Sequence, residues 1–106
     1  MRTIKSNEIE LIKKLTNGLF EIPELVRDMD DGKMGSISFD IEKRQTRNDQ
    51  ISAAEYIDAD GILVDIELTS DKNGKLFELD FWKVDFSPLK VYPTIEKLKI
   101  KAPNKS

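Results

Sequence analysis

Three consecutive runs of residues alternate apolar and polar side chains with a period of two. That period is typical of a β-strand with one buried face, because successive side chains point to opposite faces of a sheet. The runs cover residues 51–58, 62–69 and 76–84, and the pairs Asp60-Gly61 and Asn73-Gly74 separate them. Both pairs favour two-residue hairpin turns. The pattern therefore predicts an antiparallel meander with one buried face.

The segment before the meander predicts a helix and a hairpin. Residues 6–17 carry an apolar stripe at helical spacing, with Ser6 as the N-cap and Gly18 as the stop signal. Residues 24–30 and 33–41 are expected to be strands joined by a turn at Asp31-Gly32. We expect an α+β fold in which the N-terminal helix packs on an antiparallel sheet of about five strands, a hairpin plus the meander.

The remaining segments predict loops and a tail. Residues 42–50 are polar throughout, which indicates an exposed loop. Residues 94–101 fit either a last turn of helix or an edge strand, and the final five residues are expected to fray. At 106 residues the chain has the size of one domain. We assign residues 1–93 to a single α+β domain and residues 94–106 to a short, partly disordered basic tail.

The absence of two residue types narrows the chemistry. The chain has no cysteine and no histidine. Disulfides, zinc–thiolate sites and catalysis by Cys-His or Ser-His-Asp sets are therefore excluded. A short chain without cysteine fits a reducing compartment, and no segment resembles a signal peptide or a membrane span. These features favour a cytoplasmic protein that is not an enzyme and has no cofactor.

Acidic residues are concentrated in one part of the chain. Residues 49–85 contain ten Asp or Glu and three Lys, a net charge of −7, whereas residues 1–48 are neutral and residues 86–106 carry +4. The acidic block coincides with the predicted meander, so the negative charge is expected on the sheet.

The two predicted turns fix which residues face one another on the polar side of the meander. A two-residue turn at Asn73-Gly74 places Glu67 opposite Asp80, Asp65 opposite Trp82 and Thr69 opposite Glu78. A two-residue turn at Asp60-Gly61 adds Tyr56 opposite Asp65. Aromatic rings beside unpaired acids are typical of protein–protein hot spots for a cationic partner. The predicted partner-binding residues are Tyr56, Asp65, Glu67, Glu78, Asp80 and Trp82. The alternative is a solvated face on which the tail covers Trp82, through Pro88 or Tyr92.

Other kinds of site are weaker. Asp28–Gly32 and Asp58–Gly61 resemble calcium loops superficially, but neither fits the 12-residue EF-hand, so no metal site is predicted. Catalysis by the neighbouring carboxylates Glu67 and Asp80 would need a cleft, and a flat sheet has none. Basic residues in 43–47 and in the tail are outweighed by the acidic isoelectric point near 5.0, so nucleic acid is not expected as a partner.

Two motifs resemble those of a known family. Residues 30–36, Asp-Asp-Gly-Lys-Met-Gly-Ser, and residues 77–88, Phe-Glu-Leu-Asp-Phe-Trp-Lys-Val-Asp-Phe-Ser-Pro, resemble an uncharacterised family of small bacterial proteins over roughly residues 1–93. That family implies no activity and no catalytic residues. In size and acidic sheet the chain is also similar to the immunity proteins of bacterial toxin systems.

The sequence therefore favours a non-catalytic protein-binding domain. The most concrete form is an immunity protein that neutralises a cognate toxin through the acidic sheet face, with a basic toxin domain as the protein partner and no membrane partner. The alternatives are a self-associating structural or regulatory module and a small-ligand or metal-binding domain. Neither the partner nor the oligomeric state follows from the sequence.

Overall fold

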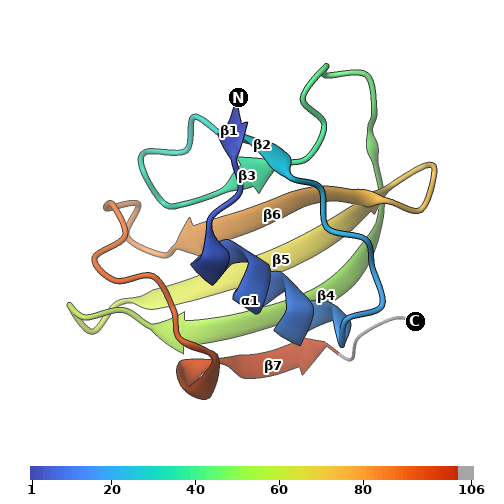
Figure 1. Ribbon diagram of the computed structural model, residues 1–106. Coiled ribbons are helices and arrows are strands. Elements are labelled where there is room, and N and C mark those ends of the chain that lie inside the picture. The colour runs from blue at the N-terminus through green and yellow to red at the C-terminus, as the bar shows by residue number, and fades with distance from the viewer. Residues whose placement is uncertain (103–106) are drawn as a thin grey trace.

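The predicted meander forms the middle of the sheet in the computed structural model, which describes residues 1–102 (Figure 1). Its strands are β4 (Arg47–Ile57), β5 (Leu63–Asp71) and β6 (Leu76–Lys83). Seven strands lie in the order β1-β2-β3-β6-β5-β4-β7, and every neighbouring pair is antiparallel. The α+β class is confirmed, but the sheet is larger than the expected five strands. The other strands are β1 (Arg2–Thr3), β2 (Leu25–Asp28), β3 (Ile37–Ser38) and β7 (Lys99–Ala102).

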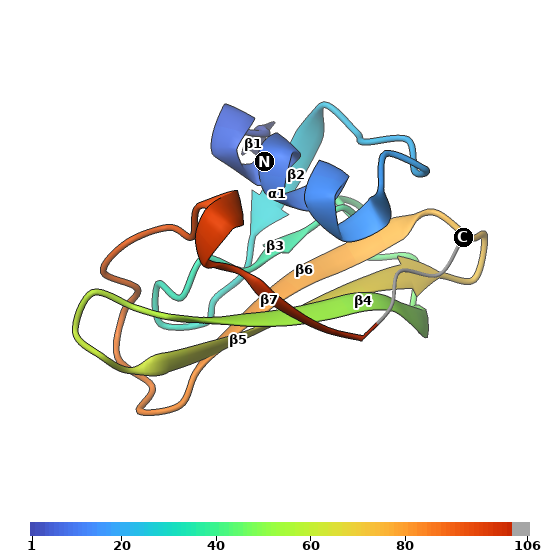
Figure 2. The ribbon, with the colours of Figure 1, turned by 90° about the horizontal axis from the view of Figure 1, so that it is seen from below.

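The predicted N-terminal helix, α1 (Ser6–Thr16), covers one face of the sheet (Figure 2). Leu11, Ile12 and Leu15 are fully buried, and they join the core side chains of the strands. The N-cap is Lys5 rather than Ser6, because the Glu8 carboxylate accepts the backbone N–H of Lys5 at 2.8 Å. The opposite face of the sheet remains free of helices among the described residues.

The predicted register of β5 and β6 is confirmed. Asp65 pairs with Trp82, Glu67 with Asp80 and Thr69 with Glu78. The turn itself is not the expected type I′ turn, because Gly74 has a positive φ and Asn73 does not. The Asp71 N–H donates instead to the Lys75 carbonyl, so the turn contains the three residues 72–74 rather than two. A bulge at Phe77 restores the register for the rest of the two strands.

The predicted register of β4 and β5 is wrong by one residue. Tyr56 pairs with Val64, and Asp65 pairs with Glu55. The cause is a longer turn, in which the Gly61 N–H donates to the Asp58 carbonyl and the Asp58 N–H to the Ile62 carbonyl. A shift of one residue moves a side chain to the other face. Tyr56 is therefore buried on the helix side, where its hydroxyl donates to the Val91 carbonyl at 2.8 Å.

The second strand of the predicted hairpin is much shorter than expected. Only Ile37–Ser38, not residues 33–41, forms a strand. The carboxylate of Asp31 accepts the backbone N–H groups of Met34 at 3.1 Å and of Ser36 at 2.9 Å. These bonds hold residues 29–36 as a loop in place of a two-residue turn.

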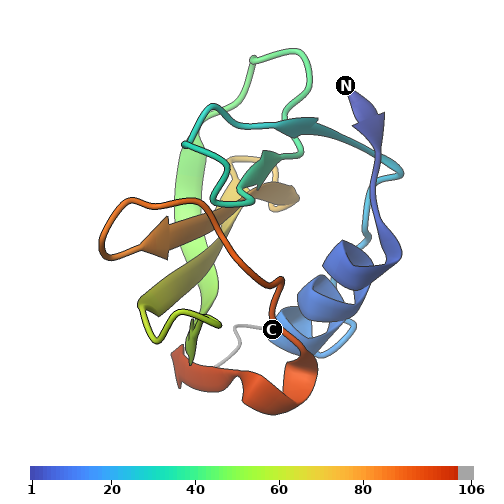
Figure 3. The same cartoon turned by 90° about the vertical axis from the view of Figure 1, so that its left-hand side faces the viewer.

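Parts of the segments expected to be a loop (42–50) and a tail (94–106) belong to strands. The loop predicted over 42–50 ends early, because β4 begins at Arg47. After β6 the chain crosses to the helix side of the sheet, makes the 3-10 turn Ile95–Lys97, and returns as β7 beside β4 (Figure 3). Both readings of residues 94–101 are thus realised in succession. The expected fraying concerns mainly residues 103–106, which lie outside the described part of the chain. Within residues 1–102, no helix has the length and apolarity needed to cross a membrane.

Candidate functional site

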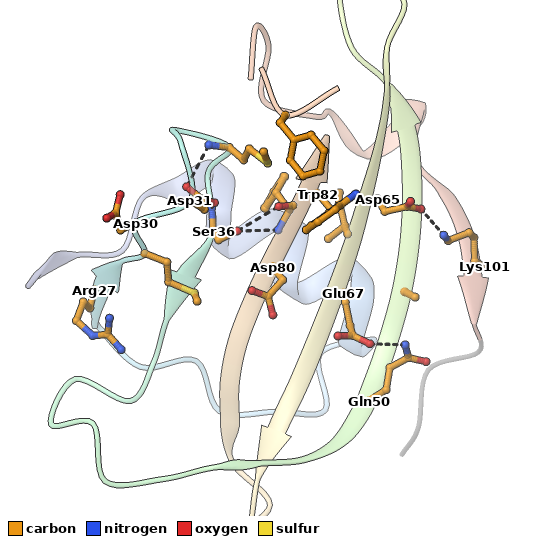
Figure 4. A pocket seen from close by; sticks show the side chains of 16 residues that line it. Arg27, Asp30, Asp31, Ser36, Gln50, Asp65, Glu67, Asp80, Trp82 and Lys101 are labelled. Carbon is orange, nitrogen blue, oxygen red and sulfur yellow. Dashed lines mark hydrogen bonds and ion pairs between the residues drawn. The ribbon is translucent and has the colours of Figure 1, made fainter. Parts of the chain in front are cut away.

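A groove of about 710 Å³ lies on the sheet face opposite the helix (Figure 4). Four of the predicted binding residues line it, Asp65, Glu67, Asp80 and Trp82. The β2–β3 loop forms one wall, and Lys101 of β7 lies at the other side. We call this feature the acidic groove. The expectation of a flat face without a cleft is therefore wrong.

The groove exists because β3 is too short to follow β6 along its length. Beyond the pair of Ile37 and Leu79, side chains rather than a strand satisfy the edge of β6. The Ser36 hydroxyl accepts the Phe81 N–H at 2.8 Å, and the sulfur of Met34 lies 3.4 Å from the Lys83 backbone nitrogen. The loop that carries Ser36 and Met34 departs from the sheet plane and becomes the wall of the groove.

Trp82 is open to solvent in the acidic groove. The residue is 54% exposed, so neither Pro88 nor Tyr92 nor the rest of the described tail covers it. Its ring contact is Phe86, with centroids 4.9 Å apart and the planes at 74°. Phe86 is 62% exposed and has a φ of 63°, a left-handed conformation that is uncommon for a bulky residue. An aromatic pair is thus held at the surface with little burial.

The carboxylates of the acidic groove differ in their cationic partners. Lys101 forms an ion pair with Asp65, and Arg47 forms one with Glu67 at 3.0 Å. Gln50 also donates to Glu67 at 2.7 Å. Within residues 1–102, no Lys or Arg forms an ion pair with Asp80 or Glu78. The middle of the face therefore carries two carboxyl groups without a bound cation.

Burial and neighbouring charges alter these two carboxyl groups. Partial burial raises the pKa of Asp80 to about 6, and repulsion from Glu78, Glu67 and Asp31 adds to this effect. Burial also raises the pKa of Glu78, although the positive charge of Arg27 opposes the change. Because burial and repulsion disfavour the ionised form of these two groups, an approaching cation would stabilise that form.

A second charged cluster lies at one end of the sheet, and sequence reasoning missed it. Lys83 is fully buried, and its ammonium lies 2.8 Å from Asp58, 2.6 Å from Asp60 and 3.1 Å from the Pro88 carbonyl. The segment read as a superficial calcium loop thus holds a lysine of the same chain. The signal was available, because Lys83 follows Leu79 and Phe81 at inward positions of β6.

Asp58 organises this cluster. Besides Lys83, its carboxylate accepts the backbone N–H groups of Lys90 at 2.8 Å and Val91 at 3.0 Å. Burial alone would raise the pKa of Asp58, but the bonds from Lys83 and the backbone lower it to about 2. The cluster ties the segment after β6 to the β4–β5 turn, so we assign it a structural role.

The chain matches the model of a known protein family. Residues 1–93 match the family DUF6984, described as a domain of unknown function. The chain belongs to this family. No curated protein and no solved structure matches it. The match confirms the resemblance to an uncharacterised family, and the likeness to immunity proteins stays a prediction.

The DUF6984 match contains all of the acidic groove except Lys101. Five of the six predicted binding residues lie on the groove face, with Glu78 in the row next to Asp80, and Tyr56 does not. Sequence reasoning missed Phe86, Arg47, Lys101 and the β2–β3 loop as parts of this face. The hydrophobic motif residue Phe86 gave no signal, because only the left-handed turn brings its ring to Trp82.

Asp80→Asn is expected to stabilise the DUF6984 domain at neutral pH. The folded-state pKa of about 6 exceeds the ordinary 3.8, so the folded state binds more protons between pH 4 and 6. The contribution of Asp80 to stability therefore falls as the pH rises through this window. After allowance for solvent screening, the variant should gain roughly 1–2 kcal/mol at pH 7.5 and nothing at pH 4.

Urea unfolding of both proteins between pH 4 and 7.5 checks this prediction. Glu24→Gln is the matched control, because Glu24 is exposed and does not line the acidic groove. Stability differences that stay constant with pH would contradict a raised pKa for Asp80.

Proposed function

We propose that this DUF6984 protein is a non-catalytic binding domain whose acidic groove receives a basic surface of a partner protein. One observation carries the proposal. The partly buried carboxyl group of Asp80 has no cationic partner among the described residues, and an exposed aromatic pair lies in the same groove. Neither the unpaired, partly buried carboxyl group nor the exposed aromatic pair is needed to keep a sheet face solvated.

The arrangement fits recognition better than stability. Ionised Asp80 destabilises the free domain, and an approaching cation reverses that effect. Trp82 and Phe86 provide exposed apolar area in a groove that several carboxyl groups also line. Tryptophan and complementary charge are typical of the few residues that dominate a protein interface. Binding residues that lower the stability of the free protein are common at functional sites.

The most concrete form of this proposal is a cytoplasmic immunity protein that neutralises a toxin. A nuclease toxin has a basic cleft for its substrate, and an acidic surface that docks there blocks substrate access. The excess of seven negative charges in residues 49–85 would also speed the encounter through electrostatic steering. No chemistry of the DUF6984 domain itself is needed for this role.

A capture experiment with two forms of the protein tests the proposal. The wild type and the double variant Glu67→Lys, Asp80→Lys are immobilised and exposed at low salt to lysate of the organism that carries the gene. We expect a basic protein that the wild type retains and the double variant does not. Its expression alone should stop growth, and co-expression of the DUF6984 protein should restore growth.

The outcomes separate the two levels of the proposal. Identical sets of proteins on both forms would contradict a role for the acidic groove. A groove-dependent partner without toxicity would leave the binding function and overturn the immunity role.

A further inference from the structure

Resting on the proposed function, we infer that the acidic groove recognises an arginine side chain of the partner. The guanidinium lies between the carboxylates of Asp80 and Glu67, and its plane lies against the ring of Trp82. Asp80 and Glu67 face each other across β6 and β5, and Trp82 follows Asp80 by two residues on the same face of β6. Two residues along a strand span about 6.6 Å, which suits an arginine that touches both.

The chain's own cations indicate which position is vacant. Lys101 reaches over the sheet from β7 to Asp65, and Arg47 reaches from the start of β4 to Glu67. Both are long side chains that lie along the polar face and end on a carboxylate. Asp80 lies on the far side of Glu67 from β4, and no long cation of the described chain fills the equivalent place there. In the proposed complex, the partner's arginine forms the corresponding ion pair with Asp80.

Among the described residues, Arg27 lines the groove on the side of Asp80 that faces β2, but its place in the sheet argues against competition for Asp80. Arg27 pairs with Ser38, and Ser38 pairs with Glu78, so Arg27 belongs to the row of Glu78 rather than to that of Asp80. It forms no ion pair or side-chain hydrogen bond to a carboxylate within residues 1–102. Its charge acts on Glu78, and Asp80 has no ion pair within residues 1–102. An external cation at Asp80 would therefore meet Glu67 with Arg47 already bound at one of its oxygens.

The chemistry of the guanidinium group and the presence of Trp82 favour arginine over lysine at this site. A guanidinium presents five N–H donors in a plane, so it can bond two carboxylates from opposite sides, whereas an ammonium acts as a compact point charge. Guanidinium groups are weakly hydrated and stack on aromatic rings, with tryptophan the best partner. The edge-to-face contact with Phe86 restrains the Trp82 ring, which reduces the cost of ordering it.

Short peptides provide a test that needs no partner. The pentapeptide Gly-Gly-Arg-Gly-Gly, with blocked ends, is titrated into the full chain at low salt while the fluorescence of Trp82, the only tryptophan, is recorded. Matched peptides carry lysine or the uncharged isostere citrulline in place of arginine. We expect the arginine peptide to bind at least about fivefold more tightly than the lysine peptide, and the citrulline peptide to give no saturable change.

Two variants locate the binding. Asp80→Asn should weaken binding of the arginine peptide by about tenfold, since a charged hydrogen-bond acceptor is lost. The control variant Glu24→Gln removes one negative charge outside the groove and should leave the affinity unchanged. Asp80→Asn is expected to fold, because it relieves repulsion among the carboxylates.

Each other outcome overturns the inference in a recognisable way. Equal binding of arginine and lysine peptides, both weakened by Asp80→Asn, would overturn arginine recognition and leave the acidic groove as a general cation site. Binding that Asp80→Asn does not weaken would overturn the assigned position. No saturable response to the arginine peptide would overturn the inference, and the capture experiment would then judge the proposed function independently.

Discussion

Asp58→Ala is expected to lower the free energy of unfolding by about 3–5 kcal/mol, the range for breaking a buried ion pair by removal of one partner. The variant leaves the buried ammonium of Lys83 with only Asp60 and a carbonyl. It also deprives the backbone N–H groups of Lys90 and Val91 of their acceptor. Urea unfolding at pH 7 measures the loss.

Asp60→Ala is the matched control for this prediction. Asp60 contacts the same ammonium, but its side chain is 29% exposed and accepts fewer bonds from the rest of the chain. Its replacement should therefore cost clearly less than that of Asp58. Equal losses in the two variants, or a loss below about 1 kcal/mol for Asp58→Ala, would contradict the structural role of the cluster.

The same cluster predicts sensitivity to acid. The folded-state pKa of Asp58, about 2, is below the ordinary 3.8. Its contribution to stability is therefore complete above pH 4 and is lost as the pH falls towards 2. This part of the acid response should be absent in Asp58→Ala.

Reversal of charge in the acidic groove is expected to have the largest effect on binding. The double variant Glu67→Lys, Asp80→Lys should lower the affinity for the partner retained in the capture experiment by at least about 100-fold. Removing one member of a desolvated charge pair at an interface typically costs 2–5 kcal/mol, and reversal adds repulsion. Titration calorimetry of both proteins at the same salt concentration measures the difference.

Salt separates this effect from loss of structure. Wild-type affinity should fall steeply as salt screens the acidic groove, whereas the residual affinity of the double variant should depend little on salt. Glu24→Lys reverses one charge outside the groove, so this variant should keep an affinity within a fewfold of that of the wild type. Equal losses in Glu24→Lys and the groove variant would show that net charge, and not the groove, determines binding.

The alternation of residues 62–84 predicted most of the site because it predicts faces directly. Leu68 and Leu79 had to face the core, so Glu67 and Asp80 had to share the other face, and the bulge at Phe77 did not alter this. Tyr56 was placed wrongly because one additional turn residue at 58–61 flips the register, and Asp-Gly pairs do not specify the turn length.

The groove itself could not be predicted from local patterns. It depends on the early end of β3, which follows from the bonds that Asp31 makes to its own loop. The exposed pair of Trp82 and Phe86 depends on a left-handed residue that is not glycine, for which the sequence gives no signal. The cluster around Lys83 joins segments 25 residues apart, so it needs the completed sheet.

The carboxyl titration of Asp80 tests the central claim of a vacant cation site most directly. Carbon NMR of the side chain, assigned with Asp80→Asn, gives the pKa in the free protein and in the complex with the retained partner. We predict a value near 6 in the free protein and a decrease of at least about one unit in the complex, because a bound cation favours the ionised form. An ordinary value near 4 that the partner does not change would contradict the account.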